Sequence, residues 1–222
     1  MRETDTPRVI AGLRVRWREL GSSFGLWEPD DPDALLDGMT QDEFERSDER
    51  MPYFSAIWAS AESLVAHLLL GPPLDGMRTL DLGCGLGPCG FAAAARGARV
   101  TFLDWEPRSL DLVAASARDG GWPPDAFELV VGDWRDPPAL GPFDVILGAD
   151  VLYERRNAPA VAAFLASHLL SDGEAWIADP GRPQAAIFPS ILRDAGLQLL
   201  EAITLPPMPH GTDVVLYRIG RF

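Results

Sequence analysis

The residues that most clearly suggest chemistry lie in a glycine-rich segment from Asp81 to Gly90. Its second half, Gly85 to Gly90, satisfies the Gly-x-Gly-x-x-Gly pattern of dinucleotide-binding turns. Three details argue against a dinucleotide. Pro88 removes a backbone N–H donor where a pyrophosphate would bind, the Asp81 carboxylate would face that pyrophosphate, and the matching glycine is not the first after the strand. The segment therefore favours a cofactor that has no phosphate groups.

S-adenosylmethionine meets this requirement, because it carries a sulfonium and an ammonium group that a carboxylate such as Asp81 attracts. Gly83 and Gly85 allow the backbone to approach the methionine part of the cofactor closely. Asp104 stands 21 residues after Gly83, at the end of an expected strand, where a carboxylate accepts hydrogen bonds from ribose hydroxyls. We therefore expect S-adenosylmethionine rather than a nicotinamide or flavin dinucleotide.

Acidic and aromatic residues after the neighbouring strands are candidates for the adenine end of this site. Asp133 offers an acceptor for the adenine amine, and Trp134 offers an aromatic face for the ring. Trp105, which follows Asp104, is assigned to the same cofactor site. Each residue alone has an ordinary explanation, because an Asp at a strand end often caps a helix and a Trp often packs in a core. Their order on successive strands favours the binding site.

Short apolar runs predict the strands that position these residues. Expected strands cover Met77–Leu82, Ala98–Leu103, Phe127–Val131, Phe143–Gly148, Glu174–Ala178, Leu197–Leu205 and Val214–Ile219. Helical patterns separate most of them, at Cys89–Arg96 with Pro88 in its first turn, Pro107–Asp119, Asn157–Leu170 and Gln184–Ala195. This alternation predicts an α/β fold, a doubly wound Rossmann-like sheet of seven mostly parallel strands. The last two strands have no helix between them, which predicts an antiparallel C-terminal strand.

The first 75 residues have a different pattern and are expected to form an N-terminal annex packed on the core. Arg8–Leu20 alternates as a strand or hairpin, and a capping pattern at Thr40 is typical of the start of a short helix. Ser55–Leu70 has the apolar stripe of a longer helix. The expected division is residues 1–75 for the annex and residues 76–222 for the cofactor-binding domain.

Composition and charge exclude several classes of protein. The 222 residues are 47% hydrophobic, which suits one globular domain with a sizeable core. A net charge of −14 repels phosphate backbones and anionic lipid, so we expect no nucleic-acid and no membrane partner. The two cysteines and three histidines lack metal-binding spacing, so no metal is expected. With neither a signal-peptide pattern nor an apolar run of about 18 residues, we expect a soluble, cytoplasmic protein. A monomer is assigned as the default, because the sequence does not reveal the oligomeric state.

Three segments resemble the class I, seven-β-strand methyltransferases. Leu80–Gly87 resembles their motif I, and Pro52–Leu64 resembles the helix that precedes motif I in a group of protein lysine methyltransferases. Gly148–Tyr153 resembles the Asp-x-x-Tyr motif of that group. The group includes the enzymes that modify the β subunit of electron transfer flavoprotein and several chaperones, and it has many bacterial members.

The resemblance implies an S-adenosylmethionine-dependent methyltransferase that acts on a protein lysine. It implies that the cofactor contacts Trp58, Gly83, Cys84, Gly85, Asp104, Trp134 and Ala149. It also places Asp150 beside the transferred methyl group. We expect Asp150 and Tyr153 to hold and orient the neutral amine of the acceptor. The alternative is structural, with Asp150 as a cap and Tyr153 packed in the core.

Two other functions stay open at the level of the sequence. A small amine or heterocyclic metabolite is the alternative acceptor, which a narrow pocket walled by Trp27, Phe54 and Trp58 would favour. A sensor or scaffold that binds the cofactor without methyl transfer is the alternative of another class. An acidic stretch from Asp30 to Glu45 would attract a basic protein partner, although a solvated acidic face is the preferred explanation.

Overall fold

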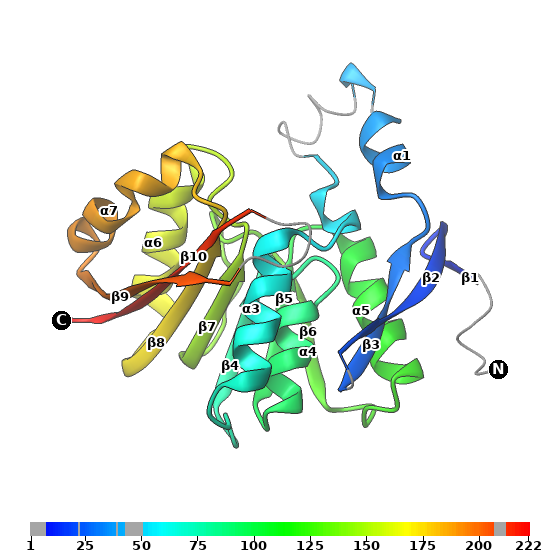
Figure 1. Cartoon of the computed structure of the whole chain (residues 1–222), viewed down its shortest axis with the longest axis horizontal. Helices are drawn as coiled ribbons and strands as arrows, with labels where there is room; N and C mark the ends of the chain where they lie inside the picture. The colour runs from blue at the N-terminus through cyan, green and yellow to red at the C-terminus, as the bar shows by residue number, and fades with distance from the viewer. Residues whose placement is uncertain (1–7, 22, 39, 43–50, 207–211) are drawn as a thin grey trace.

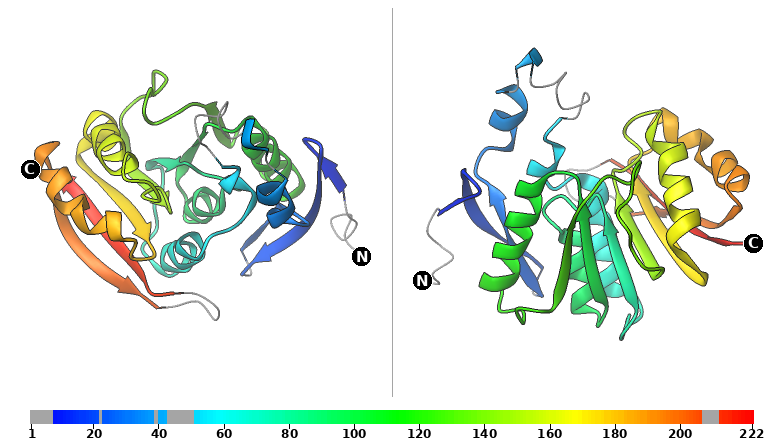
Figure 2. Two further views of the ribbon diagram at one scale, coloured as in Figure 1. Left: turned by 90° about the horizontal axis from the view of Figure 1, so that it is seen from above. Right: turned by 180° about the vertical axis from the view of Figure 1, so that it is seen from behind.

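The computed structural model describes residues 8–21, 23–38, 40–42, 51–206 and 212–222. Within these ranges the chain forms a seven-stranded sheet, a separate three-stranded sheet, and helices on both faces of the larger sheet (Figure 1, Figure 2). None of the helices in these ranges has the length and apolar character needed to cross a lipid bilayer.

The larger sheet has the strand order β6-β5-β4-β7-β8-β10-β9. Its strands are β4 (Arg78–Leu82), β5 (Arg99–Asp104), β6 (Phe127–Val131), β7 (Phe143–Ala149), β8 (Leu169–Asp179), β9 (Leu197–Leu205) and β10 (Val214–Arg221). The strands β4 to β8 pair in parallel, whereas β10 is antiparallel to both of its neighbours, β8 and β9. The prediction of a doubly wound, mostly parallel sheet with an antiparallel C-terminal strand is confirmed.

Helices cover both faces of this sheet and create two apolar cores. One face carries α3 (Ala59–Leu70), α4 (Pro88–Ala95) and α5 (Pro107–Asp119), and the other carries α6 (Asn157–His168) and α7 (Phe188–Asp194) (Figure 2). Val145 and Leu147 of β7 pack in the first core, and Ile146 between them packs in the second. Burial on both faces explains why the central strands are continuous apolar runs in the sequence.

The N-terminal segment forms an antiparallel sheet of β1 (Arg8–Ile10), β2 (Leu13–Leu20) and β3 (Phe24–Pro29). The expected hairpin is confirmed in the pairing of β1 with β2. Its turn consists of Ala11 and Gly12, whose positive φ angles of 51° and 79° match the twist of a two-residue hairpin.

The third strand of this sheet, β3, is additional to the sequence prediction. It packs against α5, where the backbone N–H of Trp27 donates to Ser116 Oγ at 2.8 Å. The indole N–H of Trp27 donates to the Asp119 carboxylate at 2.9 Å. These contacts attach the small sheet to the larger one through α5. The division of the chain at residue 75 stays a prediction.

Two helices begin later than the sequence pattern predicts. The prediction of a helix over Ser55–Leu70 is wrong at its start, because a 3-10 turn, η2 (Tyr53–Ser55), and an extended Trp58 precede α3. The expected helix over Gln184–Ala195 begins instead as a 3-10 turn, η3 (Pro183–Ile187), followed by α7. The prolines at the start of η3 and α7 lack the N–H group that a continuous helix would use.

The boundary between α6 and β8 also differs from the prediction. The expected helix over Asn157–Leu170 is wrong at its last two residues, because Leu169 is extended, with φ −82° and ψ 134°, and pairs with Phe143 of β7. Strand β8 is therefore longer than the expected strand over Glu174–Ala178.

The acidic segment that leads to the larger domain contains a short helix, α1 (Pro32–Asp37), which the sequence pattern did not predict. The Asp31 side chain caps it by accepting the N–H of Ala34. The helix expected to open at Thr40 falls mostly on residues 43–50, which lie outside the described residues.

Candidate active site

A cavity of about 380 Å³ lies at the carboxyl ends of β4, β5 and β7. This is the position where the strand order reverses and where open α/β sheets bind ligands. The sequence candidates that line it are Trp58, Asp81, Gly83, Cys84, Gly85, Asp104, Trp105, Trp134, Ala149, Asp150 and Tyr153. The exception is Asp133, which lines a small hollow beside the cavity. The role of each residue stays a prediction.

The turn after β4 consists of glycines because its backbone adopts left-handed conformations. Gly83, Gly85 and Gly87 have φ angles of 63°, 54° and 78°. A Cβ atom on Gly83 would lie 2.8 Å from the Trp134 ring and 3.3 Å from the Val151 side chain. Position 83 therefore requires glycine both for its conformation and for the close approach of the indole.

Asp81 connects the end of β4 to the helix that follows the turn. Its carboxylate accepts the N–H of Gly90 in α4 at 2.7 Å, and only 2% of the residue is exposed. Burial raises the pKa of Asp81 to about 7, with the nearby Asp104 carboxylate adding to the rise. A bound cation, such as the ammonium group of the expected cofactor, would favour the ionised form.

Asp104 attaches the glycine-rich turn to the end of β5. One carboxylate oxygen accepts the N–H of Gly85 at 2.8 Å, and the other accepts the N–H of Glu106 at 3.0 Å. Burial raises the pKa of Asp104 to about 6 in spite of these hydrogen bonds. The Trp105 backbone N–H also donates to this carboxylate. Because a carboxylate accepts about four hydrogen bonds, Asp104 keeps capacity for a ligand hydroxyl.

The expected adenine end contains Trp134, Trp105 and Asp133 in different positions. Trp134 is buried, and its indole N–H has no hydrogen-bond partner in the part of the chain that the structure describes. Trp105 lines both the cavity and the small hollow. The Asp133 carboxylate is paired with Arg135 at 2.8 Å and faces the hollow. The structure brings the two tryptophans to the cavity and leaves Asp133 at its side.

Residues 53–58 roof the cavity, and sequence reasoning found Trp58 among them but not Tyr53. The Trp58 indole N–H donates to the Tyr53 carbonyl at 2.9 Å, and the two rings meet edge to face at 5.7 Å. Phe54 lies beneath the Arg108 guanidinium, 5.2 Å from it. Trp27, the other expected wall of a narrow pocket, is buried against α5 and does not line the cavity.

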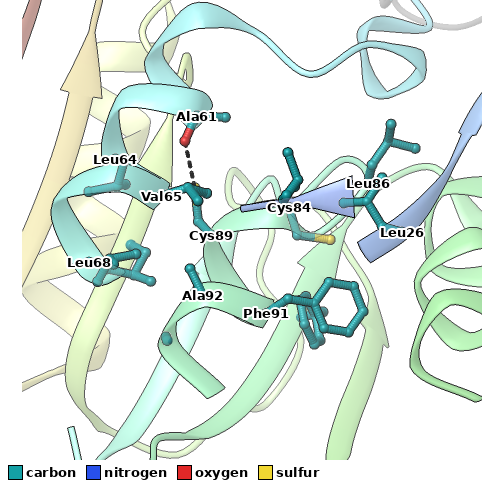
Figure 3. Close-up of a cluster of buried hydrophobic side chains, with 14 of the residues drawn as sticks. Leu26, Ala61, Leu64, Val65, Leu68, Cys84, Leu86, Cys89, Phe91 and Ala92 are labelled. Carbon is teal, nitrogen blue, oxygen red and sulfur yellow. Dashed lines mark hydrogen bonds between the residues drawn. The ribbon is translucent and has the colours of Figure 1, made fainter. Parts of the chain in front are cut away.

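The two cysteines of the glycine-rich segment are buried free thiols. Figure 3 shows Cys89 beside α3, where its Sγ contacts the Ala61 carbonyl at 3.9 Å, and Cys84 beside Leu86. Burial raises the pKa of both thiols, so neither is poised as a thiolate nucleophile. Their side chains belong to the apolar floor under the cavity.

Asp150 stands at the end of β7 in a left-handed conformation, with φ 59°. Its backbone N–H donates to the Ala178 carbonyl of β8 at 3.0 Å, which fixes this conformation. Its carboxylate is ion-paired with Arg182, a lining residue that sequence reasoning missed. Only its position in the sequence could have indicated a place in the site, because Arg182 follows the carboxyl end of β8, the strand next to β7.

Tyr153 lies three residues after Asp150 on the same side of the cavity. Burial raises the pKa of its hydroxyl to about 12, with the Glu154 carboxylate adding to the rise. Its ring meets that of Tyr53 edge to face at 5.3 Å. The phenol therefore stays protonated at neutral pH and is suited to hydrogen bonding rather than to removal of a proton.

The doubly wound sheet and a cavity at its switch point define a protein that binds a nucleotide-like cofactor. Residues 79–173 match the family described as "Methyltransferase domain". A solved structure, magnesium protoporphyrin IX methyltransferase from Synechocystis with bound S-adenosylmethionine, has the same fold. It superposes with a TM-score of 0.60 at 22% identity, covering 85% of this chain and 89% of that chain.

Curated relatives belong to the same class. Cypemycin N-terminal methyltransferase of Streptomyces is 34% identical over 60% of this chain and 54% of its own length. Protein N-lysine methyltransferase METTL21A of Danio rerio is 33% identical over 55% of this chain and 58% of its own. Electron transfer flavoprotein β-subunit lysine methyltransferase of Xenopus laevis is 29% identical over 62% and 56%. The match thus spans slightly more than half the length of these relatives.

Residues 79–173 therefore match a methyltransferase domain, and the chain has the class I fold and resembles S-adenosylmethionine-dependent methyltransferases, the protein lysine methyltransferase group among them. The residues present fit this cofactor. The glycine turn leaves no room for a side chain at Gly83, two buried carboxylates line the cavity, and the Trp134 indole N–H is unpartnered in the described structure. Asp81, Asp104 and Trp134 would hold the cofactor.

Replacing Gly83 with alanine is expected to weaken binding of S-adenosylhomocysteine at least about tenfold, because the new Cβ displaces the Trp134 ring. Isothermal titration calorimetry measures the affinity. Gly121→Ala is the control, since Gly121 has φ 79° but no atom within 4 Å of the place that a Cβ would occupy. Equal affinities in the Gly83 variant and the wild type would contradict this assignment of the turn.

Asp81 is expected to make the unliganded protein less stable as the pH rises from 4 to 7. Its folded-state pKa of about 7 lies above the ordinary value of 3.8, so its stabilising contribution is complete below the ordinary pKa and is lost as the pH rises through 7. Asp81→Asn should remove this slope, on the order of 3 kcal/mol, in urea unfolding at each pH. Asp111→Asn, on the exposed side of α5, should leave the slope unchanged.

Proposed function

We propose that the protein methylates the side-chain amine of a lysine in a protein substrate, with S-adenosylmethionine as the methyl donor. The observation that carries this proposal is the acidic and aromatic lining of the cavity beside Asp150. Asp150 and Glu154 supply carboxylates there, and Tyr53 and Tyr153 supply aromatic rings. Such a lining attracts a cationic amine through charge and cation–π contact and disfavours an anionic acceptor.

S-adenosylmethionine supplies, when bound, a methyl group activated by the sulfonium, and transfer to an amine releases S-adenosylhomocysteine and a proton. The amine needs a free lone pair, whereas a free lysine has a pKa of about 10.4 and is mostly protonated at neutral pH. The chain must therefore bind the acceptor, orient it and favour its neutral form. Correct orientation supplies a large part of the acceleration in such reactions.

Asp150 and Tyr153 are the residues that we assign to this task. The Asp150 carboxylate accepts a hydrogen bond from the amine, and its fixed left-handed backbone sets the direction of that bond. The protonated Tyr153 hydroxyl and the surrounding rings position the alkyl chain. The roof of residues 53–58 limits access of water to the reacting atoms.

Three of the relatives support an amine on a protein or peptide as the acceptor. Two of them are named as protein lysine methyltransferases, and a third is named for a peptide N-terminus. An α-amine and a lysine amine share the same nucleophilic nitrogen, so the cavity suits both. A small amine metabolite and a non-catalytic sensor are the outcomes that a transfer experiment separates from this proposal.

The acidic segment near the cavity supports a basic protein as the partner. Asp31, Asp33, Asp37 and Asp42 are exposed on and around α1. This helix contacts the roof of the cavity, where the Ser55 hydroxyl donates to the Pro32 carbonyl at 3.4 Å. Carboxylates beside the opening would steer a lysine-bearing, positively charged surface toward it.

Asp150→Asn is expected to reduce methyl transfer at least about 100-fold, because asparagine lacks the carboxylate charge. The affinity for S-adenosylhomocysteine should change less than about threefold, because asparagine tolerates the same backbone conformation. Isotope-labelled S-adenosylmethionine is incubated with a host lysate, which is then separated into proteins, peptides and small molecules. Asp172→Asn, at an exposed position, is the matched control.

Label in protein lysine that disappears with Asp150→Asn supports the proposal. Label confined to peptide N-termini or to small molecules would show that this group, and not a protein lysine, is the acceptor. Cofactor binding without any label would favour the sensor. Unchanged transfer in the Asp150 variant would remove this residue from the site.

A variant with asparagine at four exposed acidic positions is expected to have a KM for the labelled protein about threefold to tenfold higher, and a KM that depends less on salt concentration. The four positions are Asp31, Asp33, Asp37 and Asp42. The control exchanges Asp111, Asp125, Asp172 and Asp194, which are exposed elsewhere and change the net charge equally. An equal effect of both sets on steady-state kinetics would show that only net charge matters.

A further inference from the structure

Arg182 lies between two carboxylates at the acceptor end of the cavity. Its guanidinium pairs with Asp150, and the same Nη1 lies 3.9 Å from Asp179 Oδ2. Its backbone N–H donates to Asp179 Oδ1 at 2.8 Å, which fixes the turn after β8. The side chain lines the cavity and is 27% exposed. The arginine is therefore built into the site and also faces a ligand.

The two carboxylates occupy different environments. Asp179 is fully buried, and its Oδ2 has no hydrogen-bond partner in the described residues. Asp150 reaches the cavity and is held by the hydrogen bond from its N–H to Ala178. Arg182 therefore has one structural partner, Asp179, and one partner, Asp150, that the proposed function places beside the acceptor.

This arrangement answers a conflict in the chemistry of amine methylation. A carboxylate beside a lysine attracts it but also stabilises the ammonium form, which has no lone pair for attack. A guanidinium paired with that carboxylate cancels most of its charge while leaving oxygen lone pairs to accept a hydrogen bond from a neutral amine. Arginine suits this task because it stays protonated at every physiological pH.

We propose that Arg182 is a positioning residue that neutralises Asp150 and so keeps the acceptor amine uncharged for methyl transfer. The inference rests on the proposed function, since it assumes an amine acceptor beside Asp150. The other titratable groups around the cavity are unchanged in every variant. They are Tyr53, Asp81, Cys84, Cys89, Asp104, Tyr153, Glu154, Asp179 and Tyr217. The contribution of Arg182 is therefore read from a difference between variants.

A pair of cofactor analogues tests this electrostatic role without a known acceptor. Sinefungin carries a primary ammonium group where S-adenosylmethionine carries its methyl group, and S-adenosylhomocysteine carries no charge there. The ratio of their dissociation constants therefore reports how well the acceptor end tolerates an ammonium. Calorimetry measures both constants from pH 6 to pH 10 in the wild type, Arg182→Gln, Arg182→Lys and Asp150→Asn.

Arg182→Gln should increase the affinity for sinefungin relative to that for S-adenosylhomocysteine by on the order of tenfold, because the Asp150 carboxylate loses its counter-charge. The preference for sinefungin should also persist to higher pH, since the bound sinefungin amine stays protonated to a higher pH. Arg182→Lys should stay near the wild type, and Asp150→Asn should move the ratio in the opposite direction. Arg193→Gln, an exposed arginine of α7, is the matched control and should leave the ratio unchanged.

A purely structural role for Arg182 predicts a different result. Binding of both analogues should then weaken equally, and the ratio of their dissociation constants should not change. That result would overturn the inference even if methyl transfer to lysine were established. Failure of both analogues to bind the wild type would instead remove the proposed function, and the inference with it. With a labelled acceptor in hand, the pH dependence of kcat, which reports groups in the enzyme–substrate complex, should shift to higher pH in Arg182→Gln, and an unshifted profile would contradict the role.

Discussion

The hydrogen bond between the Asp104 carboxylate and the N–H of Gly85 is the contact on which the site depends. It joins the turn after β4 to the end of β5, so the cavity has a fixed floor. The left-handed glycines make this approach possible, and the Trp134 ring fills the space that a side chain at Gly83 would need. A single constraint, the absence of Cβ at these positions, therefore sets both the path of the backbone and the wall of the cavity.

The proposed function places two opposing electrostatic requirements on the cavity. A cationic cofactor and a lysine-bearing partner are both attracted by negative charge, which the lining carboxylates and the acidic segment supply. The reaction, however, needs a neutral nitrogen. Burial raises the pKa of Asp81 to about 7, so part of its negative charge develops only when a cation binds. Arg182 cancels charge at the other end, beside Asp150.

The sequence predicted the central sheet well because its strands are apolar runs bounded by glycines and acids, and burial on both faces produces that pattern. The glycine turn, Asp104 and Asp150 were predictable because they directly follow such strands. By contrast, β3 forms through pairing with β2 and packing on α5, and Arg182 is defined by a carboxylate from another strand. Contacts between distant segments leave no local pattern, which is also why Asp133 was expected in the main cavity.

The acceptor end combines residues from inside and outside the part of the chain that matches the methyltransferase family, because Asp150 and Tyr153 lie inside the match. The match covers residues 79–173, whereas Tyr53 and Trp58 precede it and Arg182 follows it. The matched part contains the glycine turn and the carboxylates that suit the cofactor, and relatives with different acceptors share it. The roof and the turn after β8 are therefore the parts of the acceptor end that the family match does not include. Exchange of these two segments between relatives should change the acceptor while cofactor binding is retained.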